Sequence, residues 1–204
     1  MTARTTSRLT TKGRATRDRI VATASALMLE RSVARTTIED IQHAAQVSAS
    51  QLYHYFTDKN ALVMAVIDHQ TDQVLGVQHQ GLDKLDSFAA LRKWRDLVVG
   101  ILKEVNCVGG CPLGSLASDL AETDPLARAR LAKSFAQWEK LLRAGLAAMQ
   151  DRGELRTGAD PDDLALAMLS AVQGGLLLSQ VRRDTRPLEV AMDTMLEHIE
   201  AQTA

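Results

Sequence analysis

The sequence is poor in aromatic residues, proline and cysteine. Aromatic side chains make up 3% of its 204 residues, and there are four prolines and two cysteines. The cysteines, Cys107 and Cys111, are too few for a disulfide framework, and no further ligands lie near them at the spacing of a zinc site. With 46% hydrophobic residues and few prolines, the composition excludes a disordered chain and is typical of a helix-rich soluble protein.

Long hydrophobic runs are scarce as well. No apolar run approaches the length of a membrane-spanning helix, which favours a protein without a membrane partner. The first residues, MTARTTSRLTTKGRATR, are basic but lack the apolar core of a secretory signal. We therefore expect a cytoplasmic protein, large enough for one compact unit or for one small and one larger domain.

Positive charge is concentrated at the N-terminal end. Residues 1–60 carry nine Lys and Arg against five Asp and Glu, a formal charge of +4, and the remaining 144 residues carry −5. A basic N-terminal region followed by an acidic remainder is typical of a protein that binds phosphate groups at one end. For the basic tail taken alone, a solvated charged face remains the alternative.

Two helix starts lie close together between residues 36 and 51. Thr36 or Thr37, followed three residues later by an acidic residue, has the spacing of a capping box. Ser48-x-x-Gln51 has the same spacing, so a second helix is predicted to begin only a few residues after the first one ends. Two short helices joined by so tight a turn form a helix-turn-helix, whose second helix can enter the DNA major groove.

The residues of this helix-turn-helix, at about 38–57, occur in a specific order. An Ile-x-x-Ala-Ala pattern is followed by Val47-Ser48, by Leu52-Tyr53-x-Tyr55-Phe56, and then by Lys59 and Leu62. This order is similar to that of the DNA-binding segment of TetR/AcrR-type transcriptional regulators, over roughly residues 14–67. The resemblance implies a DNA-binding transcription regulator, and neither an enzyme nor a cofactor nor a metal site.

The resemblance also implies an all-α fold in two parts. An N-terminal three-helix helix-turn-helix DNA-binding domain is expected at residues 14–60, after a flexible basic tail at 1–13. A C-terminal helical ligand-binding and dimerisation domain is expected at 61–204. Hydrophobic periodicity supports helices throughout this second part, and two Asp-Pro pairs in it mark helix starts.

DNA contacts are expected at the second helix of the motif and around it. By the resemblance, the first turn of that helix faces base edges, where Gln can bond adenine, and the other contacts reach phosphates. Packing against another helix remains the alternative for Tyr53. The expected contacts are Thr37, Ser48, Ala49, Ser50, Gln51, Tyr53, His54 and Lys59.

The segment from Pro161 to about Arg183 is apolar nearly all round, and the rest of a modest domain is too small to cover it. We therefore expect a homodimer formed through the last two helices, as the resemblance also implies. Ala171, Gly174 and Gly175 would permit close approach of helices. An intramolecular core is the alternative.

The resemblance further implies an unidentified small-molecule effector that releases a homodimeric repressor from an inverted repeat in double-stranded operator DNA. A Gly-Cys-Pro-x-Gly-x-Leu segment at residues 110–116 is similar to one near the ligand pocket of some TetR-type proteins. Filling of the core is the alternative for each predicted pocket residue. These residues are Trp94, Cys111, Leu116, Phe135, Trp138, Leu142 and Met168.

Two further functions compete with this prediction. One is a helical small-molecule-binding or thiol-based sensor module without a DNA-binding role. The other is a cysteine enzyme that uses Cys111 with a distant His, although no acid–base constellation or phosphate loop supports it. A sensor would need an exposed thiolate of lowered pKa, whereas the other interpretation of Cys111 is a small buried residue at a helix start.

Overall fold

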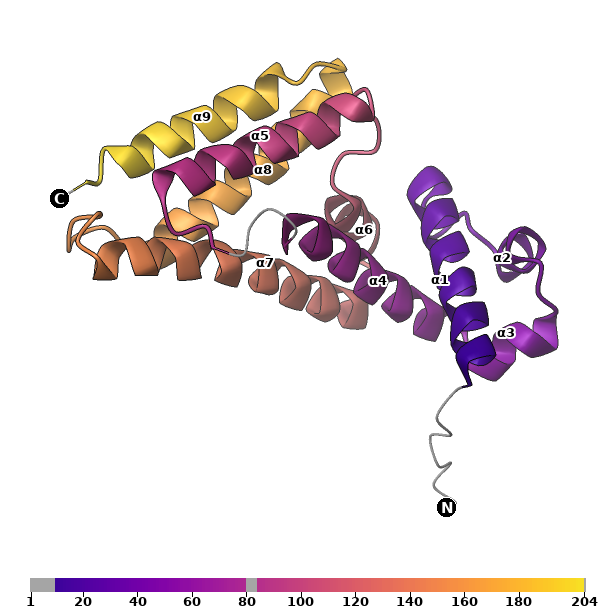
Figure 1. The fold of residues 1–204 in the computed structure, drawn as a ribbon. Helices are drawn as coiled ribbons and strands as arrows, with labels where there is room; N and C mark the ends of the chain where they lie inside the picture. The colour runs from indigo at the N-terminus through magenta and orange to yellow at the C-terminus, as the bar shows by residue number, and fades with distance from the viewer. Residues whose placement is uncertain (1–9, 80–83, 204) are drawn as a thin grey trace. The chain divides into compact units, whose positions relative to one another are not determined.

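The computed structural model describes residues 10–79 and 84–203, whose regular elements are all α-helices (Figure 1). They belong to two compact units, unit 1 within residues 1–69 and unit 2 within residues 70–204. The predicted all-α fold with an N-terminal helix-turn-helix is confirmed. The flexibility expected of the first residues lies outside the described residues, and so does Gly81, whose residue type predicts the end of a helix.

Unit 1 contains α1 (Thr11–Arg31), α2 (Ile38–Ala45), α3 (Ala49–Tyr55) and the first half of α4 (Lys59–His79). α1 begins within the predicted tail, because the Thr10 hydroxyl caps it by accepting from the Gly13 N–H at 3.1 Å. One face of α1 packs against α2. The largest fully buried side chains of this unit are Ile20, Met28, Ile41, Leu52, Leu62 and Ile67.

Unit 2 contains the end of α4 together with α5 (Phe88–Glu104), α6 (Pro112–Leu120), α7 (Pro125–Asp151), α8 (Pro161–Arg182) and α9 (Arg186–Glu200). α8 packs against α7 and α9, α5 packs against α9, and α6 packs against α7 (Figure 1). Asp124 and Asp160 cap α7 and α8, with Pro as the first helical residue of each, as predicted.

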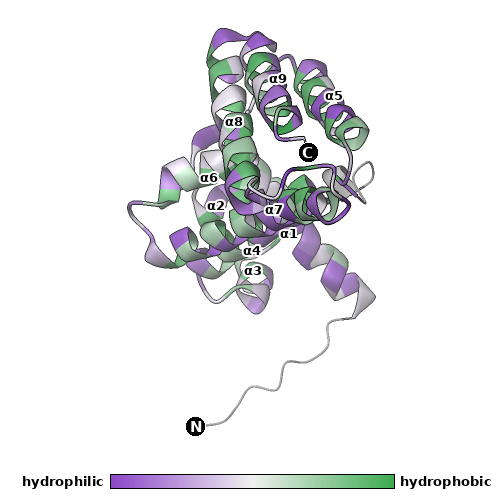
Figure 2. Cartoon of the chain, turned by 90° about the vertical axis from the view of Figure 1, so that its left-hand side faces the viewer, coloured by the Kyte–Doolittle hydropathy of each residue, from purple (hydrophilic) through white to green (hydrophobic). Residues whose placement is uncertain are grey.

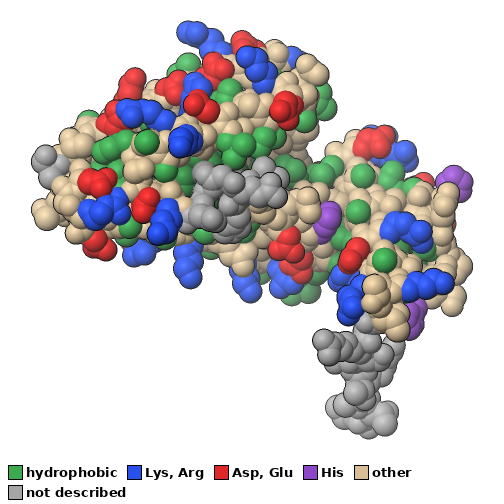
Figure 3. All heavy atoms as spheres, viewed as in Figure 1, with side chains coloured by type: hydrophobic (Ala, Val, Ile, Leu, Met, Phe, Trp, Pro, Cys, Tyr) green, Lys and Arg blue, Asp and Glu red, His purple; other side chains and the backbone are tan. Residues whose placement is uncertain are grey.

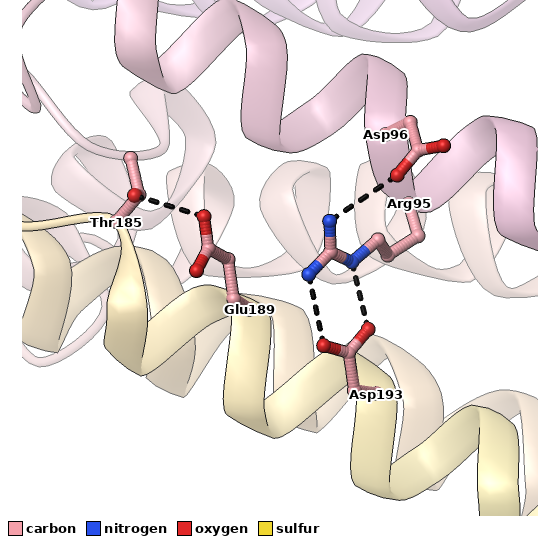
Figure 4. Close-up of polar contacts among 5 residues, drawn as sticks. All are labelled: Arg95, Asp96, Thr185, Glu189 and Asp193. Atoms are coloured by element: carbon pink, nitrogen blue, oxygen red, sulfur yellow. Dashed lines mark hydrogen bonds and ion pairs between the residues drawn. The ribbon is translucent and has the colours of Figure 1, made fainter.

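An ion-pair cluster joins α5 to α9 along their outer edge. Both helices alternate between hydrophilic and hydrophobic residues (Figure 2), and acidic and basic side chains are interspersed over this part of the surface (Figure 3). Arg95 on α5 donates from Nε and Nη2 to the two carboxylate oxygens of Asp193 on α9, at 2.7 and 2.8 Å (Figure 4). Such a two-pronged contact fixes direction as well as distance, so it orients α5 on α9.

The expectation that no apolar run approaches the length of a membrane-spanning helix is wrong for α8. Its 22 residues are long and apolar enough to cross a membrane, by length and composition alone. In unit 2, however, 44% of its most apolar window is buried, and the core helix of a soluble protein passes the same test. Large apolar side chains also lie on the outer side of α8, where Leu177 and Val181 are 60% and 75% exposed.

Candidate DNA-binding site and ligand-binding residues

The first helix of the motif is held by a complete capping box. The Thr37 hydroxyl accepts from the Asp40 N–H at 3.1 Å, and the Thr37 N–H donates to the Asp40 carboxylate at 2.9 Å. Hydrogen bonds from the Thr37 side chain and backbone hold the pKa of the Asp40 carboxyl below its usual value. Thr37 is therefore the cap of α2, and Thr36 is instead buried, where its hydroxyl donates to the Ser32 carbonyl.

The turn between α2 and α3 passes through Gln46 and Val47. Gln46 has φ 51°, in the left-handed region, and the Val47 N–H donates back to the Gln42 carbonyl at 3.0 Å. This pattern satisfies the last carbonyls of α2 and stops the helix. Val47 is buried and fixes the turn to unit 1, so that Ser48 can begin α3 directly afterwards.

α3 presents one face to solvent and one to the core. Leu52 is fully buried and the following Phe56 is 4% exposed, so both belong to the core of unit 1. Tyr53 is 52% exposed, which does not support the alternative that it packs against another helix. The predicted contact residues on α3 are all exposed on the free surface of the motif: Ala49, Ser50, Gln51, Tyr53 and His54.

The observed cap and the predicted base contact of Gln51 would both use its Oε1 atom. Its Oε1 accepts from the Ser48 N–H at 3.0 Å, and its own N–H donates to the Ser48 hydroxyl at 3.2 Å. Recognition of adenine by a Gln amide uses both the oxygen and the nitrogen. Gln51 would therefore exchange the Ser48 N–H for a base when it reads DNA, while Ser48 keeps its bond to the backbone of α3.

Lys59 and Thr37 already have partners within unit 1. The Lys59 ammonium donates to the Val33 carbonyl at 2.8 Å, and so ties the start of α4 to the connection between α1 and α2. An ammonium has three donors, so a phosphate contact remains open to it. The Thr37 N–H faces the Asp40 carboxylate, and Glu39 adds a second acidic side chain to the same turn. The phosphate contacts of both residues stay predictions.

The predicted pocket residues lie on α5, α6, α7 and α8 and at the cap of α6, all in unit 2. Phe135 is half-buried and the others are buried, namely Trp94, Cys111, Leu116, Trp138, Leu142 and Met168. Burial fits both a ligand pocket and a filled core. The ligand-binding role of each of these residues therefore stays a prediction.

Three buried donors have no hydrogen-bond partner within the part of the chain that the structure describes. They are Nε1 of Trp94, Nε1 of Trp138 and Nε2 of Gln173. The Gln173 side chain lies beside α6, where its Oε1 would be 3.1 Å from a Cβ placed on Gly114. The sequence predicted both tryptophans as pocket residues but missed Gln173, because a Gln in an apolar helix carries no recognisable motif.

Cys111 is the cap of α6 and is buried. Its sulfur accepts from the Gly114 N–H at 3.4 Å, and burial raises the pKa of the Cys111 thiol above its usual value. Cys107 is buried as well, and both thiols are free. A reactive cysteine requires an accessible thiolate of lowered pKa, so these positions favour the buried structural role over the thiol sensor and the cysteine nucleophile.

Residues 10–79 and 84–203 contain no group of three or more His, Cys, Asp or Glu side chains that could hold a metal ion. What they do contain is a pair of short helices joined by a tight turn, with the exposed first turn of the second helix available to enter a DNA groove. The fold and the site therefore define a helix-turn-helix DNA-binding protein.

Two family models match the chain, one for each part. Residues 20–66 match the model described as bacterial regulatory proteins, tetR family. Residues 84–195, more than half of the chain, match the model described as tetracyclin repressor-like, C-terminal domain. The chain belongs to the TetR family of bacterial regulatory proteins and is a DNA-binding transcriptional regulator.

Individual relatives agree with the family assignment. The HTH-type transcriptional repressor DhaR of Mycobacterium sp. (strain GP1) is 24% identical over 89% of this chain and 90% of its own length. The HTH-type transcriptional regulator TtgR of Pseudomonas putida is 28% identical over 78% and 77%. A crystal structure of a TetR transcriptional regulator from Chloroflexus aurantiacus J-10-FL has a TM-score of 0.83, with 28% identity, and the match covers 95% of this chain and 98% of that one.

Proposed function

We propose that this regulator is a cytoplasmic, homodimeric repressor that leaves its operator when a small molecule binds in unit 2. The first turn of α3 is the observation that carries the proposal, because it is capped and its residues Ala49, Ser50 and Gln51 are exposed. Regulators of this family bind operator DNA and form dimers, and they are not enzymes. One relative of the chain is itself named a transcriptional repressor.

Gln51 provides the test of base reading. Gln51→Ala is expected to weaken the binding free energy on the cognate half-site by roughly 1–3 kcal/mol and to relax the preference at one base pair. The reason is that it removes both the acceptor oxygen and the donor nitrogen of the side-chain amide from the groove. Gln51→Glu is the matched control for the cap, since Glu keeps the acceptor for the Ser48 N–H. Both variants should lose preference for the cognate base, as measured by fluorescence anisotropy on cognate and scrambled duplexes.

The alternative, in which Gln51 only caps α3, predicts different DNA affinities for these two variants. If Gln51 serves only to hold α3, Gln51→Glu should bind DNA with the same sequence preference as the natural chain, and Gln51→Ala should lose affinity equally on cognate and scrambled DNA. Either of these two results would assign Gln51 to the helix cap and remove it from base recognition.

The outer face of α8 supports the proposed dimer. Large apolar side chains recur there at helical spacing, and α9 adds Val190, which is 51% exposed. Gly174 lies on this face, and a Cβ added to it would meet nothing within 4 Å. The exposed apolar residues of α8 are Leu166, Leu177, Leu178 and Val181. A stripe of this length is expected to be covered by a second copy.

Gly175 has a different role from its neighbour. A Cβ added to Gly175 would lie 2.8 Å from the Cα of Leu188, so this glycine permits the close approach of α8 and α9 within one subunit. The close helix approach expected at Gly175 is thus found between α8 and α9 of one subunit, and the approach expected at Gly174 stays a prediction. Adjacent residues point about 100° apart on a helix, so one glycine faces α9 and the other faces away from unit 2.

A charge on the outer face of α8 should separate the subunits. Leu177→Glu would place an unpaired carboxylate in the proposed apolar interface, and we expect a monomer with strongly reduced DNA affinity. Leu126→Glu on α7 is the control, because Leu126 is 73% exposed and lies outside the proposed interface. Light scattering coupled to size-exclusion chromatography measures both variants. A natural chain that is monomeric, or a dimeric Leu177→Glu, would contradict the proposed interface.

α4 provides the proposed connection between ligand and DNA. It is one helix whose first residues belong to unit 1 and whose last residues belong to unit 2. Lys59 ties its start to Val33, and the Thr71 hydroxyl donates to the Ser134 hydroxyl of α7 at 2.7 Å. A ligand that displaces α7 would therefore act on a helix that is anchored in the DNA-binding unit.

A further inference from the structure

Two tryptophans in unit 2 are buried without hydrogen-bond partners. Trp94 on α5 is 0% exposed and Trp138 on α7 is 3% exposed, and neither indole N–H has an acceptor within the described residues. A buried indole N–H ordinarily finds a partner, because an unpaired donor keeps the full cost of losing water. These donors therefore indicate places where an acceptor from outside the chain can be bound.

The buried part of unit 2 holds no charged side chain among the described residues. Its buried polar residues are Thr71, Ser134 and Ser179, and the partly buried Gln173 adds an uncharged amide. Arg95, the neighbour of Trp94 in the sequence, directs its guanidinium to Asp193 at the outer edge of α5 and α9. A charged ligand would be buried without a counterion, and this arrangement is strongly unfavourable.

Trp138 occupies the position best placed to influence α4. It lies four residues after Ser134 on α7, and residues at this spacing share one face of a helix. The Ser134 hydroxyl accepts from Thr71 of α4 and itself donates to the Arg130 carbonyl at 3.1 Å. An acceptor bound to the Trp138 indole would therefore lie about one helical turn from the contact that joins α7 to α4.

We propose that the effector is an uncharged, largely apolar molecule with a carbonyl or ether oxygen that accepts a hydrogen bond from Nε1 of Trp138. This inference rests on the proposed release of DNA by a small molecule, and it specifies the chemistry of that molecule. The hydrogen bond supplies the acceptor that Trp138 lacks, and the apolar remainder of the molecule meets the buried aliphatic side chains around it.

Three probes of similar shape test the chemistry directly. They are cyclohexyl methyl ketone, isopropenylcyclohexane, in which a methylene group replaces the carbonyl oxygen, and cyclohexanecarboxylate, which adds a negative charge. Equilibrium dialysis against the full chain should show saturable binding of the ketone, about tenfold weaker binding of the alkene through loss of one hydrogen bond, and the weakest binding of the carboxylate. The ketone should also change the tryptophan fluorescence, which arises from Trp94 and Trp138 alone.

Two substitutions locate the hydrogen bond. Trp138→Phe should lower the affinity for the ketone to that for the alkene and leave the affinity for the alkene unchanged, which a purely structural role of the indole would not produce. Trp94→Phe is the matched control, because it removes the other unpartnered indole and leaves Trp138 as the one tryptophan of the chain. It should keep the preference for the ketone, and the ketone should still change its fluorescence.

The outcomes separate the ligand chemistry from the regulatory function. Equal affinities for ketone and alkene, absence of ketone binding, tightest binding of the carboxylate, or a preference that persists in Trp138→Phe would each overturn the inference. DNA affinity is measured in parallel. A chain that fails to bind DNA contradicts the proposed function, and a preferred ketone that leaves DNA affinity unchanged contradicts ligand release but not the chemistry of the site.

Discussion

Raising the salt concentration from about 50 to 200 mM is expected to weaken DNA binding by a factor on the order of 10³–10⁵. The reason is the separation of charge along the chain, since residues 1–60 carry +4 and the remainder carries −5. If each subunit of the dimer neutralises roughly three to five phosphates, a plot of log K against log salt should have a slope on the order of −5 to −9. Fluorescence anisotropy with a labelled duplex measures this slope.

Two controls accompany the salt series. The melting temperature of the chain is followed over the same range, so that loss of binding is distinguished from loss of fold. A scrambled duplex should show a slope at least as steep as the cognate one, because phosphate contacts carry no sequence information. A slope near zero on both duplexes would contradict the role given to the basic N-terminal region.

Gly145→Ala is expected to destabilise unit 2 by about 3 kcal/mol or more, through overpacking. Gly145 is buried on α7, and a Cβ there would collide with the Leu85 carbonyl oxygen and lie 2.5 Å from the carbonyl carbon. Backbone atoms cannot move aside as a flexible side chain can, so the segment before α5 would have to leave α7. Urea unfolding followed by tryptophan fluorescence reports this unit, because both tryptophans belong to it.

Gly100→Ala is the matched control for this substitution. Gly100 also lies within a helix of unit 2, but a Cβ added to it would meet nothing within 4 Å. Alanine favours the helix over glycine, so this variant should be more stable than the natural chain by about 1 kcal/mol or less. Similar unfolding midpoints for the two variants would show that the close approach of Leu85 to Gly145 does not constrain the fold.

Features that depend on neighbouring residues could be predicted from the sequence. Both capping boxes, at Thr37 and Ser48, form with the predicted partners, because a side chain three residues away is within reach once a helix begins. The Asp-Pro starts of α7 and α8 are local in the same sense. The start of α1 was misplaced by three residues, since Thr10 caps it within a polar, basic segment.

Features that depend on residues far apart in the sequence could not be predicted. The bond from Lys59 to Val33 spans 26 residues, and the bond from Thr71 to Ser134 spans 63. Each pairs ordinary residue types at positions that carry no motif, so only the packing of the helices brings them together. The role of Gly175 in the close approach of α8 and α9 depends in the same way on where α9 lies.

The pocket residues illustrate a second limit. Trp94, Trp138 and Met168, predicted as pocket residues, are buried in unit 2, yet burial alone does not distinguish a core residue from a ligand contact. The ligand contact proposed at Trp138 rests instead on its indole N–H, which has no acceptor among the described residues, a feature of the packing that the sequence does not reveal. The hydrophobic pattern of the sequence therefore predicts which side chains are buried. The unpaired hydrogen-bond donors of the structure indicate what a buried side chain can bind.

Selection of DNA from a random pool tests the central claim most directly. The purified chain is incubated with random duplexes, and bound DNA is recovered and sequenced over several rounds. The proposed dimer with exposed α3 helices predicts enrichment of an inverted repeat whose half-site centres lie about 34 Å apart, or a multiple of this distance. Gln51→Glu should select a different base at one position of each half-site. Absence of enrichment, or enrichment of a single unrepeated half-site, would contradict a dimeric repressor that reads DNA through α3.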